Sequence, residues 1–229
     1  ESSIYLSNAI NITINNNNVT RNDYGILSSN STNLSIFRNN IYNDSSRGIS
    51  VSDSASLGGF ANIYENTINI TGYGIHIEGS SYYNITNNNI SNIVRGINFD
   101  EGHGIIYGNR IINSTDGGIF NPSAGIFENS SIINNYVVAG VSSFPVKMVG
   151  DGSTNITITN NTLIGGINGI SIHFPFASFF TMINNTIINF TQTGIIMPIN
   201  STSYGDVLNS SVSGANGFNP ALNSFVSNA

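Results

Sequence analysis

The sequence predicts an all-β chain wound as a parallel β-helix, a single-stranded solenoid of about eight to nine coils with an internal Asn ladder. Three observations predict this fold. An Asn followed two residues later by an aliphatic residue recurs eight times, at spacings of 21 to 27 residues. A Gly-aliphatic pair follows eight or nine residues after seven of these Asn residues. Between these points apolar residues alternate with period two, which is typical of strands with one buried face.

Each coil is expected to contain two or three short strands. The residues three before and two after each repeated Asn are all aliphatic, as Ile85 and Ile90 are around Asn88. A third aliphatic column follows the Gly, as in Gly74-Ile75. Because every strand meets its equivalent one coil away and running in the same direction, the strands should pair in parallel.

The repeated Asn is expected at a turn between two strands. Its side chain carries an acceptor and two donors, tolerates a left-handed backbone, and can bond to the same amide one coil away, at roughly 4.8 Å. Asp would stack like charges at this position, and Ser is too short to reach. The eight ladder residues are Asn17, Asn39, Asn66, Asn88, Asn109, Asn135, Asn161 and Asn185.

The Gly of each coil is expected at a second turn that needs either a positive φ or a close approach of two backbones. The sixth coil lacks this Gly and has Ser142–Val146 in its place. A second break, His173–Phe180, separates the seventh and eighth coils, and Phe180 is expected to point into the core. The residues beside Pro in these breaks are candidates for an exposed interface: Phe144, Phe174 and Phe176.

The repeat is lost near the C-terminus. We expect a β-helix over residues 1–198 and an irregular coil, cap or assembly segment over residues 199–229. Because the chain opens at Glu1 with neither a Met nor a signal peptide, we expect a processed product or a piece of a longer protein. An uncapped solenoid end exposes unpaired strands, so self-association or contact with other surface proteins is expected.

The Asn-x-Ile and Gly-Ile units, such as Asn88-Asn89-Ile90 and Gly96-Ile97, resemble the right-handed parallel β-helix repeats of the pectin-lyase-like superfamily. Within that superfamily these repeat units are most similar to those of the periplasmic NosD-like proteins and of the Asn-rich adhesin-like surface proteins of archaea. The resemblance covers residues 8–198 and implies a right-handed coil. It selects no function, because that superfamily includes lyases, hydrolases, epimerases, phage tailspikes, adhesins and structural proteins.

The composition favours an exterior location. Only 8% of the residues are charged, whereas an ordinary soluble domain has roughly 25% charged residues. The chain contains no Cys, which removes disulfides as a stabiliser and does not indicate a compartment. The six Lys and Arg residues are scattered, which argues against nucleic acid as a partner. No apolar run reaches the length of a membrane span.

Sixteen acceptor sequences for N-glycosylation support the same location, because such glycans are added to exported chains. Several recur at a constant offset from a ladder Asn, at positions expected to point outward. The acceptors are Asn11, Asn18, Asn30, Asn33, Asn43, Asn69, Asn84, Asn89, Asn113, Asn129, Asn155, Asn160, Asn184, Asn189, Asn200 and Asn209.

One group of charged residues is expected to lie close together, because its members occupy equivalent positions in successive coils. Glu78 and Asp100 each lie four residues after the Gly of successive coils, and His76 lies two residues after the first of these Gly residues. With Glu101 and His103 nearby, the carboxylates could hold a hard cation such as calcium or share a proton. They are also the minimum for glycoside hydrolysis. The alternative is a solvated edge with a shared counter-ion, and no other cofactor is expected.

Three functional hypotheses follow. The first is an extracellular or cell-surface structural or adhesive protein without catalysis, glycosylated and assembled into a filament, coat or array. The second is a carbohydrate-active enzyme or tailspike-like depolymerase, a lyase or hydrolase acting on a polysaccharide through Glu78, Asp100 and His76. Of the motifs of polygalacturonase-like enzymes, however, the chain retains only His103-Gly104. The third is a carbohydrate-binding module.

Overall fold

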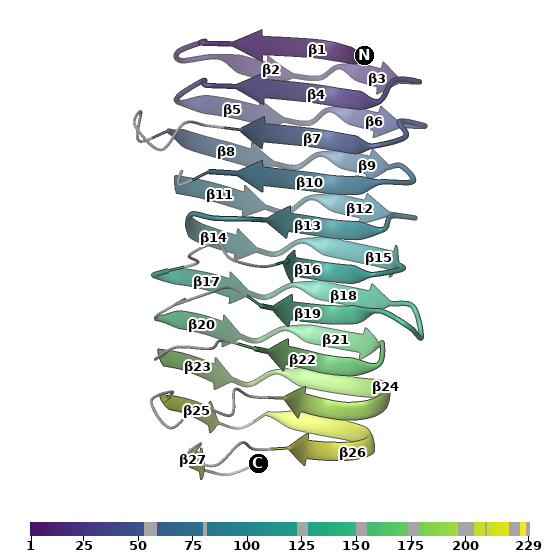
Figure 1. Cartoon of the computed structure of the whole chain (residues 1–229), viewed down its shortest axis with the longest axis vertical. Helices are drawn as coiled ribbons and strands as arrows, with labels where there is room; N and C mark the ends of the chain where they lie inside the picture. The colour runs from purple at the N-terminus through teal and green to yellow at the C-terminus, as the bar shows by residue number, and fades with distance from the viewer. Residues whose placement is uncertain are drawn as a thin grey trace.

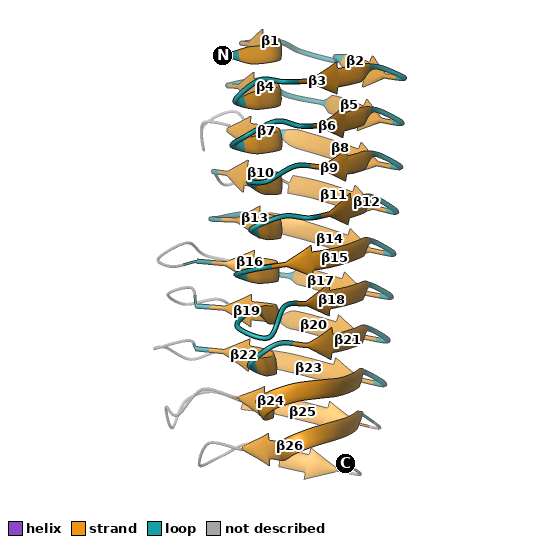
Figure 2. Ribbon diagram, turned by 90° about the vertical axis from the view of Figure 1, so that its right-hand side faces the viewer, coloured by secondary structure: helices purple, strands orange, loops and turns teal. Residues whose placement is uncertain are grey.

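The computed structural model describes residues 1–52, 59–79, 82–122, 128–149, 155–173, 179–196, 204–208, 210–219 and 225–227. Over these ranges the chain is all-β and contains no helix, so no helix there is long and apolar enough to cross a membrane. The coils are stacked along one axis, with β1 (Ser2–Ser7) at one end and β27 (Phe225–Ser227) at the other (Figure 1 and Figure 2). The predicted parallel β-helix is confirmed.

One strand of each coil belongs to a ten-stranded parallel sheet. Its members are β2 (Thr13–Asn15), β5 (Leu34–Phe37), β8 (Phe60–Tyr64), β11 (Tyr82–Thr86), β14 (His103–Tyr107), β17 (Ser130–Ile133), β20 (Ile156–Thr159), β23 (Phe179–Ile183), β25 (Tyr204–Leu208) and β27. These ten strands within the described ranges slightly exceed the predicted eight to nine coils. The reason is that β25, β26 (Ser211–Asn219) and β27 pair in parallel beyond residue 199, where the repeat can no longer be read from the sequence.

The other strands form two further faces of the coil. The strands directly after the Asn turn are β3 (Asn18–Thr20), β6 (Asn40–Tyr42), β9 (Thr67–Asn69), β12 (Asn89–Ser91), β15 (Arg110–Ser114), β18 (Tyr136–Ala139) and β21 (Thr162–Gly165). The third strands are β1, β4 (Tyr24–Ser29), β7 (Arg47–Ser52), β10 (Tyr73–Glu78), β13 (Arg95–Phe99), β16 (Gly117–Asn121), β19 (Phe144–Met148) and β22 (Asn168–Ile172). In the later coils β24 (Thr186–Ile196) and β26 run through both faces.

The core is the set of aliphatic columns predicted from the repeat. Ile63, Ile85 and Ile106 are paired across successive coils and fully buried. The column after the Asn and the column after the Gly are buried in the same way, and Phe180 lies inside as expected. Each coil thus buries its apolar side chains against the next one, which is the main source of stability in a solenoid.

The internal Asn ladder is also confirmed. Asn88 donates through Nδ2 to Oδ1 of Asn109 at 3.0 Å, to the carbonyl of Thr86 at 3.1 Å and to that of Ile63 at 2.9 Å. Its backbone N–H donates to the same Oδ1 at 2.9 Å, and its own Oδ1 accepts from Asn66. The turn is therefore closed by side chains that satisfy one another in the interior.

The structure corrects the position of the left-handed residue in this turn. The ladder Asn residues do not have positive φ; the residue directly before each of them does, for example Arg38 at 54° and Glu65 at 55°. Elsewhere that residue is Gly108 or another Asn, namely Asn16, Asn87, Asn134, Asn160 and Asn184. The Asn at the ladder position is needed for its hydrogen bonds rather than for its backbone conformation.

The repeated Gly does not lie at a turn as expected but within the third strand, as Gly74 does in β10, and the structure decides between the two explanations offered for it. The Gly column lacks positive φ, and a Cβ added to Gly74 would lie 2.5 Å from the carbonyl oxygen of Gly96 in the next coil. Close backbone approach is therefore the requirement. In the sixth coil Pro145 occupies the Gly position, and Val146 continues the apolar column opposite Ile119.

Candidate functional site

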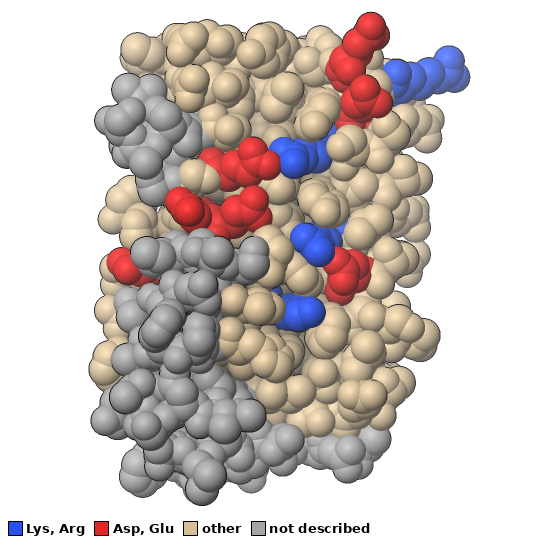
Figure 3. Space-filling model, viewed as in Figure 1, with Lys and Arg blue, Asp and Glu red and all other residues tan. Residues whose placement is uncertain are grey.

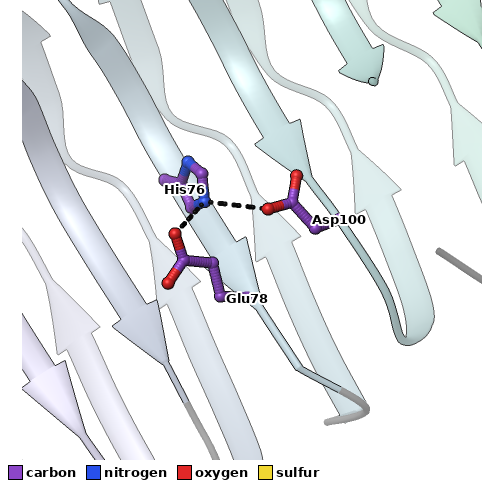
Figure 4. A group of neighbouring side chains, drawn as sticks. All are labelled: His76, Glu78 and Asp100. Carbon is purple, nitrogen blue, oxygen red and sulfur yellow. Dashed lines mark ion pairs between the residues drawn. The ribbon is translucent and has the colours of Figure 1, made fainter. Parts of the chain in front are cut away.

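The charged residues singled out from the sequence do come together. His76 and Glu78 lie on β10, and Asp100 follows β13 one coil away (Figure 4). One ligand atom from each lies within 4.8 Å of the others. We call these three residues the His76 cluster. Glu101 is exposed and lies outside this group.

The imidazole is the buried member of the His76 cluster. The His76 side chain is 4% exposed, against 36% for Glu78 and 40% for Asp100. Its Nε2 lies 2.9 Å from Oε1 of Glu78 and 3.5 Å from Oδ2 of Asp100. Neither contact is aligned as a hydrogen bond, so the attraction is electrostatic. The ring also stacks on Tyr73, with the two centroids 5.6 Å apart.

Two arginines enclose the cluster. Arg47 Nη1 lies 2.9 Å from Oε1 of Glu78 and donates to Ser50 at 3.1 Å. Arg95 pairs through Nε with Asp116 at 2.7 Å and donates through Nη1 to Oδ1 of Asn98 at 3.0 Å. Acidic and basic side chains lie side by side on this face in the half of the rod nearer the N-terminus (Figure 3).

The electrostatics of Asp100 follow from these contacts. Partial burial acts to raise the pKa of its carboxyl group, but the contact with the His76 ring, with smaller contributions from Asn98 and Arg47, outweighs burial and holds the pKa below its ordinary value. A general acid of a glycosidase needs the opposite, a raised pKa. Asp100 is therefore suited to remain a carboxylate and not to donate a proton.

Aromatic rings and cationic side chains alternate along the same face. Arg47 lies over Tyr24 with its Cζ 5.7 Å from the ring centroid, and Arg95 lies over Tyr73 at 5.1 Å. Further along, Lys147 lies 4.4 Å from the ring centroid of Phe144, so this interface candidate is partly covered by a neighbour. The other two interface candidates, Phe174 and Phe176, lie outside the described residues.

Sequence reasoning missed Arg47 and Arg95 as partners of the cluster. A signal was present, because the residue directly before each Gly in four successive coils reads Tyr24, Arg47, Tyr73 and Arg95. These residues face one another across paired strands. The other two histidines lie elsewhere: His103 donates through Nδ1 to the carbonyl of Glu128, and His173 contacts Ser171.

The fourteen described glycosylation acceptors all reach the surface. Thirteen are exposed and Asn84 is partly buried; Asn200 and Asn209 lie outside the described residues. Several form short external ladders, in which Asn33 donates through Nδ2 to Asn11 and Asn155 to Asn129, each at 3.0 Å. Asn11 and Asn129 use only Oδ1 in these contacts.

Comparison with known proteins places this geometry in a family. A family model described as periplasmic copper-binding protein (NosD) matches residues 1–132, which is more than half of the chain. This match confirms the resemblance found in the repeat. No curated protein and no solved structure matches the chain.

Proposed function

The chain belongs to the NosD family, and from this premise we propose that it is an extracellular or cell-surface β-helix protein with a structural or adhesive role and without catalysis. The periplasmic description of the family supports a location outside the cytoplasm. The observation that carries the proposal is the division of the molecule's polar groups. The interior ladder amides satisfy one another, several charged side chains are paired along one face, and the described glycosylation acceptors lie at the surface.

The proposal includes N-linked glycans on the acceptor residues at the surface. A sugar on Asn11 or Asn129 leaves the inter-coil hydrogen bond of that residue intact, because the residue only accepts there. On Asn33 or Asn155 the sugar would be attached to the Nδ2 that donates across the coils. We therefore expect glycans on the accepting member of each pair in preference to the donating one.

The proposal also includes association of this protein with other protein chains. Within the described residues β1, β2 and β3 each pair on one side only, and Ile10 beside them is 66% exposed. Unpaired strand edges are covered by another chain in many β proteins. Contact with further copies or with other surface proteins would produce the filament, coat or array.

The experiment is glycopeptide mapping of protein from its native source, together with sedimentation velocity over a range of concentrations. We expect occupied acceptors on Asn11 and Asn129 and sedimentation faster than that of a monomer. An unmodified monomer at all concentrations would contradict the proposal. Fragments released from a panel of neutral and acidic polysaccharides would contradict its non-catalytic part.

Polysaccharide cleavage remains the second candidate, because the structure does bring Glu78, Asp100 and His76 together. It predicts release of new chain ends that is abolished in Glu78→Gln and Asp100→Asn. Saturable binding without release, unchanged in both variants, would instead indicate a binding module.

The donor set of the His76 cluster does not fit the copper in the family's description. Copper(I) prefers thiolate and thioether ligands, but the chain has no Cys, and the two Met residues of the described ranges, Met148 and Met182, are buried in the core. Copper(II) accepts imidazole and carboxylate, but it needs the lone pair of His76 Nε2. The Asn98 amide beside the other ring nitrogen opposes that, so we assign no copper-dependent step to this chain. Calcium prefers six to eight oxygens, and the cluster offers two carboxylates and an imidazole.

A further inference from the structure

We propose that Asn98 closes the His76 cluster to copper by holding the imidazole in the tautomer that carries its hydrogen on Nε2, and that the cluster serves instead as a polar cross-link between coils. The hydrogen bonds of the Asn98 side-chain amide support this inference. It does not depend on whether the protein is structural, adhesive or enzymatic.

The orientation of the Asn98 amide follows from two neighbours. Arg95 Nη1 lies 3.0 Å from one amide atom, and a guanidinium can only donate, so that atom is Oδ1. The other amide atom lies 3.2 Å from Oδ1 of Asp100, and a carboxylate accepts, so that atom is Nδ2. Reversing the amide would set two donors face to face at Arg95 and two acceptors face to face at Asp100. Both contacts thus select the same orientation.

This orientation decides the tautomer of His76. Asn98 Nδ2 lies 3.2 Å from Nδ1 of the ring and is a donor, so Nδ1 must accept. A neutral imidazole that accepts at Nδ1 carries its hydrogen at Nε2. That nitrogen is directed at Glu78 and Asp100 (Figure 4), where an N–H between two carboxylate oxygens is favourable. The imidazole and the amide are both almost completely buried, so water does not compete for these bonds.

A metal ion needs the reverse arrangement. A histidine that binds a metal through Nε2 presents a free lone pair there, and its other nitrogen donates to a carboxylate, a carbonyl or water. At His76 the other nitrogen faces a donor. Copper at Nε2 would require either a reversed Asn98 amide or the loss of its hydrogen bond to the ring. Arg47, 2.9 Å from Glu78, would in addition oppose a divalent cation.

The same contacts form a continuous link across the rod. The link runs from Arg47 on β7 through Glu78 and His76 on β10 to Asn98 on β13, and from there through Arg95 to Asp116 beside β16. Four successive coils are thereby joined by polar side chains in addition to their apolar contacts. The polar groups of the cluster thus face other residues of the protein, with His76 Nε2 beside the Glu78 and Asp100 carboxylates but without an aligned hydrogen bond to either.

The first measurement is the tautomer of His76 in the unaltered protein. Long-range ¹H–¹⁵N correlation spectra distinguish Nε2–H from Nδ1–H. We expect the Nε2–H tautomer at neutral pH. Observation of Nδ1–H would overturn the proposal without any variant being made.

The second measurement is a gain of function. In Asn98→Asp the new carboxylate would accept from Nδ1–H and from Arg95, which leaves the Nε2 lone pair free for a metal. The variant loses the hydrogen bond to Asp100, so two carboxylates then face each other beside the site, which also favours a cation. We expect copper(II) affinity, measured by calorimetric titration with copper sulfate, to rise by about 10- to 100-fold over the unaltered protein, the usual size of such an outer-shell effect. Electron paramagnetic resonance of the bound copper should show one imidazole nitrogen.

Two controls isolate the cause. Asn92→Asp adds the same charge at an exposed turn, and it should leave copper affinity unchanged. His76→Ala in the Asn98→Asp background should abolish the gain. The proposal would be overturned if the unaltered protein bound one copper(II) through His76 as tightly as Asn98→Asp does. It would also be overturned if a folded Asn98→Asp protein, checked by its circular dichroism, bound copper no better than the unaltered protein.

Discussion

At the scale of single residues, the turns of this molecule depend on Asn side-chain amides that hydrogen-bond to backbone groups. A ladder Asn such as Asn109 donates to the carbonyls of Ile85 and Tyr107 and to Oδ1 of Asn135, so three acceptors that a turn would leave open are satisfied inside the coil. The residue before each ladder Asn supplies the left-handed conformation that the turn requires. The residue before the ladder Asn thus determines the backbone conformation of the turn, and the ladder Asn provides its hydrogen bonds.

Asp44 is the residue that departs from this pattern. It is buried, its Oδ1 accepts from the backbone N–H of Asn22 at 2.8 Å, and its Oδ2 has no hydrogen-bond partner among the described residues. Desolvation raises the pKa of its carboxyl group above the ordinary value, and the bond from Asn22 only partly opposes this. The folded state therefore favours the protonated acid.

Asp44→Asn should stabilise the protein at neutral pH. The folded-state pKa of Asp44 is raised, so its stabilising contribution is fully present below the unfolded-state pKa and is lost as the pH rises through the folded-state value. We expect the variant to gain about 1 kcal/mol in free energy of unfolding at pH 7, because a buried carboxylate that desolvation disfavours is replaced with a neutral amide of similar shape, and the gain to shrink toward pH 3. Urea unfolding at both pH values measures it.

The matched control is Asp23→Asn. Asp23 is exposed and accepts from the N-terminal amino group, which lowers its pKa. This change should give no gain at pH 7. A gain from Asp44→Asn that was equal at pH 3 and pH 7 would contradict the assignment of a raised pKa.

At the scale of the elements, the Gly column determines how closely one coil follows the next. In the third strand of each coil the Gly Cα lies against the carbonyl of the next coil and against an aliphatic side chain from the strand that follows the Asn turn. At Gly74 these neighbours are the carbonyl of Gly96 and the Cγ2 of Ile90, each 2.5 Å from the point where a Cβ would lie. At Gly74 a larger residue must displace one of these two neighbours.

Gly74→Ala should accordingly destabilise the protein by about 1–3 kcal/mol, the usual range for an overpacked core. Chemical unfolding followed by circular dichroism gives the value. Gly140→Ala is the control, since its Cβ would meet only the carbonyl of Ser114, at 3.2 Å, and should have a much smaller effect. Equal effects would mean that the close approach is not what the repeated Gly provides.

The elements also show what the sequence could predict. The ladder and the apolar columns were predictable because the same residue type recurs at the same place in every coil. The meeting of His76, Glu78 and Asp100 followed from the same register. The role of Asn98 could not be predicted, because it depends on which end of an amide faces Arg95, and neither spacing nor composition encodes a side-chain torsion.

At the scale of the whole molecule, stability is a sum of similar contacts between neighbouring coils. Asn17 and Asn39 are consecutive rungs, 22 residues apart. Removal of residues 17–38 joins Asn16 to Asn39 and preserves both the ladder and the left-handed residue before it. The fold should tolerate the loss of a complete coil but not of a partial one.

We expect the protein lacking residues 17–38 to fold into a rod shorter by about 4.8 Å, the spacing of one coil, with a smaller urea dependence of its unfolding free energy. Small-angle scattering and urea unfolding measure the two quantities. Removal of residues 17–27 takes out half a coil, reverses the inward and outward faces, and should prevent folding. Equal folding of the two deletions would contradict an additive stack of coils.

The parallel, in-register pairing of the strands also determines how the rod responds to mechanical load. The inter-strand hydrogen bonds run along the axis, so tension applied to its two ends opens the bonds of one coil before it reaches the next. Each released coil of 22 residues extends to about 75 Å of free chain. A tether made of such rods would lengthen in repeated steps under a nearly constant force, while a force across the axis would have to shear many bonds at once. Such a molecule resists lateral stress and yields gradually along its length.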